Sequence, residues 1–144
     1  MTGEPPGPLR KPLSEWAGIL DAARLRVLFQ DGTEAPWTSP LNGVKQAGTF
    51  ICAACHLPLF EADAKFDSGT GWPSFFRPID PARIATKLDL KLGVPRTEYH
   101  CARCGGHQGH VFDDGPAPTG QRYCNNGVSL LFVPQGQPLP ALRD

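Results

Sequence analysis

Two Cys-x-x-Cys pairs constrain the fold of this chain more than any other feature of its sequence. The first pair is Cys52 and Cys55, and the second is Cys101 and Cys104. Each pair places two sulfurs on one side of a tight turn, and four thiolates suit a tetrahedral zinc ion. Because residues 56–100 separate the pairs, such a site would close a large loop and stabilise the fold. The sequence therefore predicts a structural Zn²⁺ site with no open coordination position.

Two other interpretations of these cysteines stay open on the sequence alone. Either pair could be a redox dithiol instead of a pair of metal ligands. Within the zinc interpretation, His107 follows Cys104 by three residues and could replace one thiolate. His56 and His100, each next to a cysteine of a pair, are most simply surface residues.

Length and charge limit the classes of function. A chain of 144 residues is most simply one domain, and we expect a flexible N-terminal tail at 1–11, a single folded domain at 12–136 and a C-terminal tail at 137–144. Lys plus Arg and Asp plus Glu number 14 each, so no basic surplus indicates nucleic acid or an anionic membrane. No long apolar run and no signal peptide are evident. We expect a cytoplasmic monomer.

The local patterns predict a mainly β fold with short N-terminal helices. Ser14 is a candidate N-cap for a first helix carrying Trp16, Ile19, Leu20 and Ala23, and Asp21 for a second carrying Leu25 and Leu28. Residues 84–92 alternate most clearly, with Ile84, Thr86, Leu88, Leu90 and Leu92 on one face and Lys87, Asp89 and Lys91 on the other. That alternation predicts a half-buried antiparallel strand with its apolar face inward.

Cys124 is the fifth cysteine and has no partner of its own in the sequence. A lone cysteine is usually an inert, buried small hydrophobe. Arg122 lies two residues before it, and His107 and His110 lie upstream across a turn-rich segment. A nearby cation or imidazole lowers the pKa of a thiol towards the nucleophilic range. The arrangement suggests a reactive thiol without establishing one.

Several motifs together resemble the methionine-R-sulfoxide reductases of the B type (MsrB). They are GWPSF at 71–75, HQGHVFDDGPAPTG at 107–120, RYCNN at 122–126 and both cysteine pairs, with KFDSG and RTEYHC beside them. Their order and spacing agree with that family from about Ser14 to Pro134. The resemblance implies two antiparallel sheets, with the zinc away from the active site.

The resemblance also implies a catalytic set. Cys124 would attack the sulfoxide sulfur of methionine-R-sulfoxide, free or in proteins, and become a sulfenic acid. His107 and His110 would hydrogen-bond and protonate the departing oxygen, a task that suits a near-neutral imidazole. Asn126 would help to position the site.

Four further residues receive roles from the resemblance. Trp72 would form the apolar wall that receives the methyl group of the substrate, and Phe112 would pack in the same pocket. Asp114 and Arg122 would support the histidines and the thiol. Without the resemblance, the two aromatic residues are core packing and the two charged residues are a surface ion pair of little value.

The chain departs from many family members at the position of the resolving cysteine, where it has Thr70. With four cysteines assigned to zinc and Cys124 as nucleophile, no cysteine is left to form an intramolecular disulfide. We therefore expect an external reductant: thioredoxin, glutaredoxin with glutathione, or a small dithiol. Gln108 and Asn125 stand where many relatives have apolar residues, and residues 127–129 replace a common run of small residues.

Two alternatives belong to other functional classes. A zinc-clipped β module that only binds a ligand would not need Cys124 together with His107, His110 and Asn126. A zinc-ribbon nucleic-acid module would need a basic, aromatic-interleaved stripe, which this neutral chain lacks.

Overall fold

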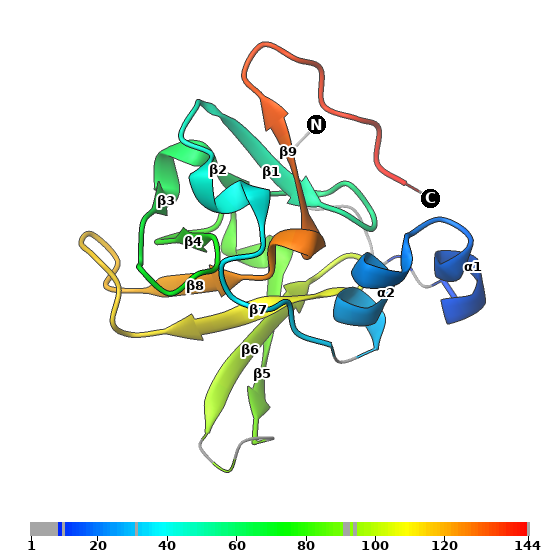
Figure 1. Cartoon of the computed structure of the whole chain (residues 1–144), viewed down its shortest axis with the longest axis horizontal. Coiled ribbons are helices and arrows are strands. Elements are labelled where there is room, and N and C mark those ends of the chain that lie inside the picture. Colours follow the sequence, from blue (N-terminus) through cyan, green and yellow to red (C-terminus); the bar gives the residue numbers. More distant parts are fainter. Residues whose placement is uncertain (1–8, 10, 31, 91–92, 94, 144) are drawn as a thin grey trace.

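Two antiparallel sheets and two short helices make up the fold, as the mainly β prediction required. The computed structural model describes residue 9 and residues 11–30, 32–90, 93 and 95–143 (Figure 1). The helices are α1 (Leu13–Ala17) and α2 (Ala22–Phe29). The strands are β1 (Gly48–Cys52), β2 (Pro58–Glu61), β3 (Lys65–Phe66), β4 (Ser74–Phe75), β5 (Ile84–Asp89), β6 (Arg96–Cys101), β7 (His107–Phe112), β8 (Arg122–Asn125) and β9 (Leu130–Pro134). Short 3₁₀ turns are η1 (Pro40–Gly43), η2 (Ala62–Ala64), η3 (Pro81–Arg83) and η4 (Gly127–Ser129).

The larger sheet has six strands in the order β3-β4-β8-β7-β6-β5, and the smaller has three in the order β2-β1-β9. The chain leaves the large sheet at the end of β8, passes through η4 and enters the small sheet as β9. The segment that carries Cys124 therefore connects the two sheets directly (Figure 1).

Aromatic side chains from both sheets form the centre of the core. Phe60 of β2 stacks on Phe75 of β4 at 4.2 Å between ring centroids, and Phe50 of β1 meets Phe75 edge-on at 5.0 Å. Tyr99 of β6 approaches Phe60 edge-on as well. All four are fully buried, so the two sheets share one apolar core.

The helix starts follow the sequence patterns only in part. Asp21 caps α2 as predicted, because its Oδ1 accepts a hydrogen bond of 2.8 Å from the backbone N–H of Arg24. Ser14 does not cap α1: the helix begins at Leu13, two residues earlier than that cap would place it, with Pro12 at the N-cap. Because α1 already ends at Ala17, Ile19 falls in a turn and is 40% exposed.

The burial pattern predicted for residues 84–92 was wrong. The strand forms, but it ends at Asp89. Asp89 is 5% exposed, whereas Leu88 is 64% and Leu90 is 59% exposed. Arg96 and His110, on the same face of the sheet, hold the Asp89 carboxylate inward. Leu88 points to the opposite face of β5, which is an edge strand of the sheet. Lys91 and Leu92 lie outside the described residues.

The ends of the described chain contact the cysteine pairs. Leu9 donates its backbone N–H to the carbonyl of Arg103 at 2.6 Å, and Arg143 donates from Nε to the carbonyl of Ala54 at 2.6 Å. Residues 1–8, 10 and 144 of the two expected tails lie outside the described residues, and the domain boundaries stay predictions. Within the described chain, no helix has the length and apolar character needed to cross a membrane.

Candidate active site

One row of side chains across the large sheet brings the predicted catalytic residues together. Cys124 of β8 is the cross-strand partner of His110 of β7, and His110 is the partner of Glu98 of β6. Ser74 of β4 lies opposite Cys124 on its other side. Directly paired residues of antiparallel strands project from the same face. The thiol, the imidazole and the carboxylate therefore share one face of the sheet.

A β-bulge places the second histidine on that face. In a regular strand, His107 and His110 would point to opposite faces because side chains alternate. The register of β6 against β7 shifts here: Tyr99 pairs with Gly109, whereas His100 pairs with His107, which leaves Gln108 as the extra residue. A bulge of this kind re-aims the side chains that follow it. The two imidazole rings consequently lie 5.6 Å apart between centroids.

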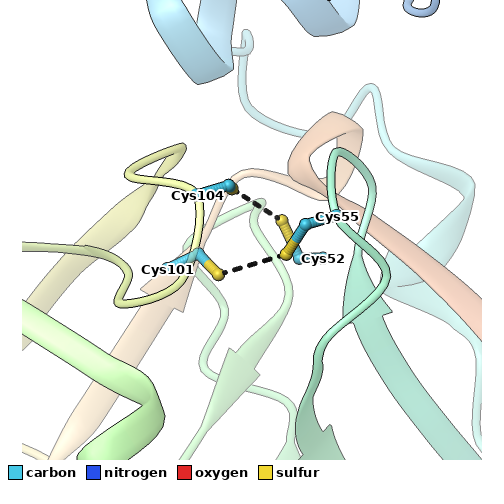
Figure 2. Close-up of side chains that lie close together, drawn as sticks. All are labelled: Cys52, Cys55, Cys101 and Cys104. Carbon is cyan, nitrogen blue, oxygen red and sulfur yellow. Dashed lines mark hydrogen bonds between the residues drawn. The ribbon is translucent and has the colours of Figure 1, made fainter. Parts of the chain in front are cut away.

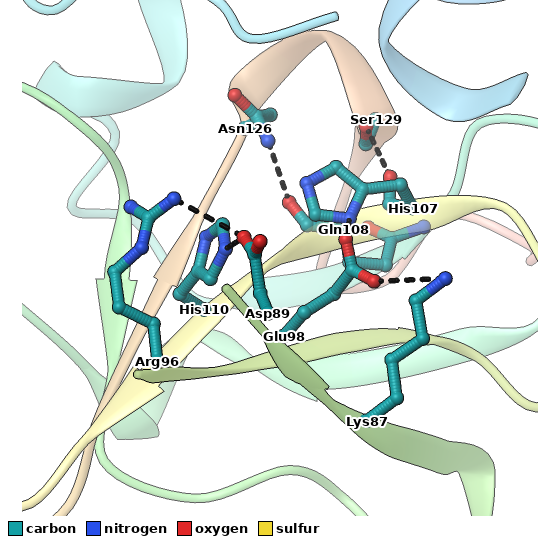
Figure 3. Close-up of polar contacts among 9 residues, drawn as sticks. All are labelled: Lys87, Asp89, Arg96, Glu98, His107, Gln108, His110, Asn126 and Ser129. Carbon is teal, nitrogen blue, oxygen red and sulfur yellow. Dashed lines mark hydrogen bonds and ion pairs between the residues drawn. The ribbon is translucent and has the colours of Figure 1, made fainter. Parts of the chain in front are cut away.

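Each histidine lies against a buried carboxylate (Figure 3). Nε2 of His110 is 2.7 Å from Oδ2 of Asp89, and Nδ1 of His107 is 3.0 Å from Oε2 of Glu98. Each carboxylate also contacts a basic side chain, Arg96 for Asp89 at 3.1 Å and Lys87 for Glu98 at 3.2 Å. A carboxylate at one ring nitrogen fixes the orientation of the ring and decides which nitrogen is left for another partner.

Sequence reasoning missed Asp89 and Glu98. Asp89 was placed on the outer face of a strand, and Glu98 was only a letter of the RTEYHC motif. Their role depends on pairing between strands that are distant in sequence. A charged residue at a predicted sheet position close to a histidine motif was the only available signal.

The environment of Cys124 acts on its thiol in two directions. Burial raises the pKa of Cys124 above its ordinary value, and the Arg122 guanidinium and the Thr70 hydroxyl oppose that rise. The net shift is upward, so the resting side chain is a thiol at neutral pH. Thr70 is itself hydrogen-bonded to Ser68 at 2.7 Å, and Ser68 to Ser74 at 2.8 Å.

Arg122 is held by two neighbours. Its Nε donates to Oδ1 of Asp114 at 2.9 Å, and its Nη2 to Oδ2 at 3.2 Å. This bidentate pair lowers the pKa of Asp114 below its ordinary value. The guanidinium also lies over the ring of Phe112, 4.3 Å from the ring centroid. Arg122 is thereby fixed two residues from Cys124, with Phe112 beneath it.

Trp72 and Asn126 both form hydrogen bonds with Glu34, a residue that the sequence patterns did not predict to be part of the site. Glu34 donates its backbone N–H to Oδ1 of Asn126 at 3.0 Å, and its carbonyl accepts from Nε1 of Trp72 at 2.9 Å. Its carboxylate accepts from the backbone N–H of Gly127 at 2.7 Å. Glu34 lies in a loop without periodicity, so no sequence pattern marked it.

A surface cavity of about 580 Å³ is lined in part by Trp72. Its lining includes Trp37, Lys65 and Ser68, but neither Cys124 nor the two histidines. A smaller cavity of about 230 Å³ is lined by Lys87, Glu98 and His107. The larger cavity is therefore not the place where the Cys124 thiol and the two imidazoles meet.

The two cysteine pairs form nearly identical turns. In the first, the N–H of His56 bonds to the carbonyl of Cys52, and in the second the N–H of Gly105 bonds to the carbonyl of Cys101, both at 2.9 Å. The residue after each pair has a positive φ, 71° at His56 and 78° at Gly105. Histidine tolerates this conformation better than most residues with a Cβ. The first turn follows β1 and the second follows β6, so each sheet contributes one pair.

The four sulfurs of these turns meet in one cluster (Figure 2). Cys52 and Cys104 are 3.7 Å apart at Sγ, and Cys55 and Cys101 are 3.6 Å apart. All four sulfurs lie within 4.8 Å of one another. A tetrahedral ion with metal–sulfur bonds of about 2.3 Å requires about 3.8 Å between sulfurs, so the cluster fits a four-thiolate metal site. His107 is not part of this cluster, and its Nδ1 faces Glu98.

Comparisons with known proteins agree with this architecture. The model of the SelR domain matches residues 20–134. A peptide methionine sulfoxide reductase MsrB of Xylella fastidiosa (strain 9a5c) is 50% identical over 136 residues, which are 94% of this chain and 86% of the relative.

Two further relatives carry the same name. The protein of Pseudomonas putida (strain W619) is 50% identical over 125 residues, 87% of this chain and 94% of the relative. That of Caulobacter vibrioides (strain NA1000 / CB15N) is 53% identical over 121 residues, 84% of this chain and 76% of the relative. With the domain match covering most of the chain, this protein belongs to the SelR-domain family, together with the MsrB proteins.

Proposed function

We propose that this protein is a peptide-methionine (R)-S-oxide reductase, which reduces methionine-R-sulfoxide in proteins or as the free amino acid. The observation that carries the proposal is the row in which Cys124 lies directly across from His110, with His107 on the same face. A soft nucleophile beside two imidazoles is what oxygen removal from a sulfoxide needs. Membership of the SelR-domain family supports the same activity.

The first half of the reaction transfers oxygen to the protein. The Cys124 thiol gives its proton to an imidazole of the His107 and His110 pair as its sulfur attacks the sulfoxide sulfur. The resulting imidazolium protonates the oxygen as the bond between that oxygen and the substrate sulfur weakens. Oxygen ends on Cys124 as a sulfenic acid, while the sulfoxide becomes a thioether. The cysteine loses two electrons and the substrate gains them. Trp72 and Phe112 form the apolar wall for the methyl group, and Asn126 positions the site.

The second half needs a reductant from outside the chain. Thr70 occupies the place where a resolving cysteine would stand, and the other four cysteines are clustered with one another. An external thiol attacks the sulfenic acid at Cys124, releasing water and forming a mixed disulfide, and a second thiol then restores Cys124. Thioredoxin, glutaredoxin with glutathione, or a small dithiol supplies these thiols, in keeping with action in the cytoplasm.

The four-cysteine cluster would hold Zn²⁺ in a structural role. Four protein ligands complete a tetrahedral site and leave no position for substrate. The ion would link the turn after β1 to the turn after β6, and so the small sheet to the large one. Asp114 and Arg122 do not take part in the reaction and support the Cys124 thiol and the nearby aromatic residues.

One experiment tests the activity and the missing resolver together. Zinc-loaded protein receives one equivalent of methionine-R-sulfoxide without reductant, and its intact mass is measured. We expect the gain of one oxygen atom, trapped at Cys124 by a sulfenic-acid probe. In a parallel sample that receives methionine-S-sulfoxide, the mass and the sulfoxide should stay unchanged. A Cys124→Ser variant should neither gain an oxygen atom nor react with the sulfenic-acid probe. Loss of two hydrogens would contradict the external-reductant mechanism, and unchanged R epimer would contradict the activity.

A further inference from the structure

A chain of buried amide and hydroxyl groups runs from the cysteine cluster to the interior of the large sheet. Nε2 of Gln108 donates to Sγ of Cys52 at 3.4 Å. Oε1 of Gln108 accepts from Nδ2 of Asn125 at 3.1 Å, and Oδ1 of Asn125 accepts from the hydroxyl of Tyr99 at 2.6 Å. Gln108, Asn125 and Tyr99 are fully buried. We call these three side chains the amide relay.

The direction of the amide relay follows from a single backbone contact. Asn125 places the same Nδ2 atom 2.9 Å from the carbonyl oxygen of Asn126. Because a backbone carbonyl can only accept, that atom must be the amide nitrogen of Asn125. Oε1 of Gln108 must then face Asn125, and Nε2 must face Cys52. The sulfur of Cys52 is therefore the acceptor at the end of the relay, a role that suits a metal-bound thiolate.

The amide relay also touches both catalytic strands. Gln108 is the bulge residue between His107 and His110, and Asn125 lies between Cys124 and Asn126. The carbonyl of Gln108 accepts from Nδ2 of Asn126 at 3.0 Å and from its backbone N–H at 2.8 Å. Moving the Gln108 backbone would therefore disturb both histidines and Asn126 at once.

We propose that Gln108 and Asn125 are positioning residues that couple metal occupancy to the geometry of β7 and β8. The inference rests on the proposed four-cysteine metal site. While the ion holds Cys52 in place, its sulfur anchors Gln108, which anchors Asn125, and the bulge keeps both histidines beside Cys124. When the ion leaves, Cys52 is free to move with the small sheet, and the relay loses its terminal acceptor.

The amide relay depends on polar side chains at positions 108 and 125. Apolar residues at positions 108 and 125 would fill the same volume without joining the cysteine cluster to the strands. Removing Gln108 alone leaves one buried donor of Asn125 unsatisfied, whereas removing Gln108 and Asn125 together with similar volume avoids that penalty. The Tyr99 hydroxyl is then the buried member of the relay that loses its acceptor. The double variant Gln108→Leu/Asn125→Val is therefore the folded reference that lacks the coupling.

The first test measures metal retention and needs no catalysis. Zinc-loaded wild type, Gln108→Leu, the double variant and the control Gln137→Leu, which changes an exposed tail residue, are mixed with a chromogenic zinc chelator. We expect both Gln108 variants to release zinc about tenfold faster than the wild type, since partners of metal ligands change affinity by about 10- to 100-fold. Release at the wild-type rate in both would overturn the proposal.

The second test measures coupling through hydrogen exchange at the amides of Gly109 and Asn125. For each protein, the exchange rate without zinc is divided by the exchange rate with zinc. We expect this ratio to be at least tenfold larger in the wild type than in the double variant. An equal effect in both proteins would overturn the coupling. If purified wild type binds no zinc, the four-cysteine metal site fails instead. If the wild type binds zinc and Gln108→Leu changes neither zinc release nor hydrogen exchange, only the proposed role of the amide relay is wrong.

Discussion

Oδ2 of Asp89 lies 2.7 Å from Nε2 of His110, although the two residues belong to strands that do not pair with each other. β5 and β7 lie on either side of β6, and the side chains reach across it on one face of the sheet. A second imidazole–carboxylate contact joins strands that do pair, where Glu98 of β6 meets His107 of β7. The two imidazole–carboxylate pairs (Figure 3) thus lie on the face of the sheet that also carries Cys124, the cross-strand partner of His110.

Removing the charge of Asp89 should impair catalysis through His110. Asp89→Asn keeps the size of the side chain but removes the anion that orients the ring. We expect kcat for methionine-R-sulfoxide to fall about tenfold or more, part of the roughly 100- to 10,000-fold that a positioned general acid contributes. KM should change little because Asp89 does not reach the substrate.

Steady-state kinetics with a dithiol reductant measures both constants. Asp113→Asn, at an exposed position on the loop after β7, serves as control. Should Asp89→Asn match that control in kcat, the pairing with His110 would have no catalytic role. If Asp89→Asn lowers kcat and is also partly unfolded under the assay conditions, Asp89 would instead be a purely structural residue.

Arg122 should set the pH at which Cys124 becomes reactive. Burial raises the pKa of Cys124 in the folded chain, and the Arg122 guanidinium opposes that rise. The alkylation rate of Cys124 should therefore rise with pH around a midpoint above the ordinary cysteine value of about 8.5. Arg122→Gln should move this midpoint further up, and the exposed Arg26→Gln should leave it unchanged.

The same shift has a consequence for stability. Because the pKa of Cys124 is higher in the folded than in the unfolded chain, ionisation of this thiol opposes folding. The stability that the protonated thiol contributes is complete at neutral pH. It is lost as the pH rises past the ordinary cysteine pKa and then through the higher pKa of the folded chain. A Cys124→Ser variant should thus lose less stability than the wild type in urea unfolding between neutral and alkaline pH. Identical pH dependence of both proteins would contradict the raised pKa.

A cysteine at position 70 should restore an internal resolver. The Thr70 hydroxyl is close enough to stabilise the Cys124 thiolate, so a thiol there can attack the sulfenic acid and release water. After one equivalent of methionine-R-sulfoxide, Thr70→Cys should lose two hydrogens, whereas the wild type gains one oxygen. Thr38→Cys, on an exposed turn, should behave as the wild type. A stable sulfenic acid in Thr70→Cys would show that the two positions cannot meet.

Gly109 should be irreplaceable because β7 and β8 approach closely at that residue. A Cβ added to Gly109 would lie 1.9 Å from the carbonyl oxygen of Cys124, whereas one added to Gly43 would meet nothing within 4 Å. Gly109→Ala should destabilise the fold by about 1–3 kcal/mol, the usual cost of overpacking. Urea unfolding measures the difference, with Gly43→Ala as control. Equal unfolding midpoints for the two variants would contradict this close approach.

The sequence predicted those local structures that depend only on neighbouring residues. The Cys-x-x-Cys turns depend on a few adjacent residues, and so does the cap that Asp21 provides for α2. The grouping of the two cysteine pairs was also predictable, because a closed metal site needs four ligands. The motif around Cys124 placed the thiol and both histidines in one segment.

Pairing between distant strands decided the rest. Asp89 turned inward against its alternation pattern because Arg96 and His110 lie on that face. The bulge at Gln108 placed both histidines beside Cys124 and could not be seen in the spacing of the motif. Glu34 joined Trp72 to Asn126 from a loop without a pattern. The sequence by itself determined which chemical groups are present and which turns hold them. The tertiary structure decided their partners, because register, bulges and loop docking depend on contacts between segments far apart in the chain.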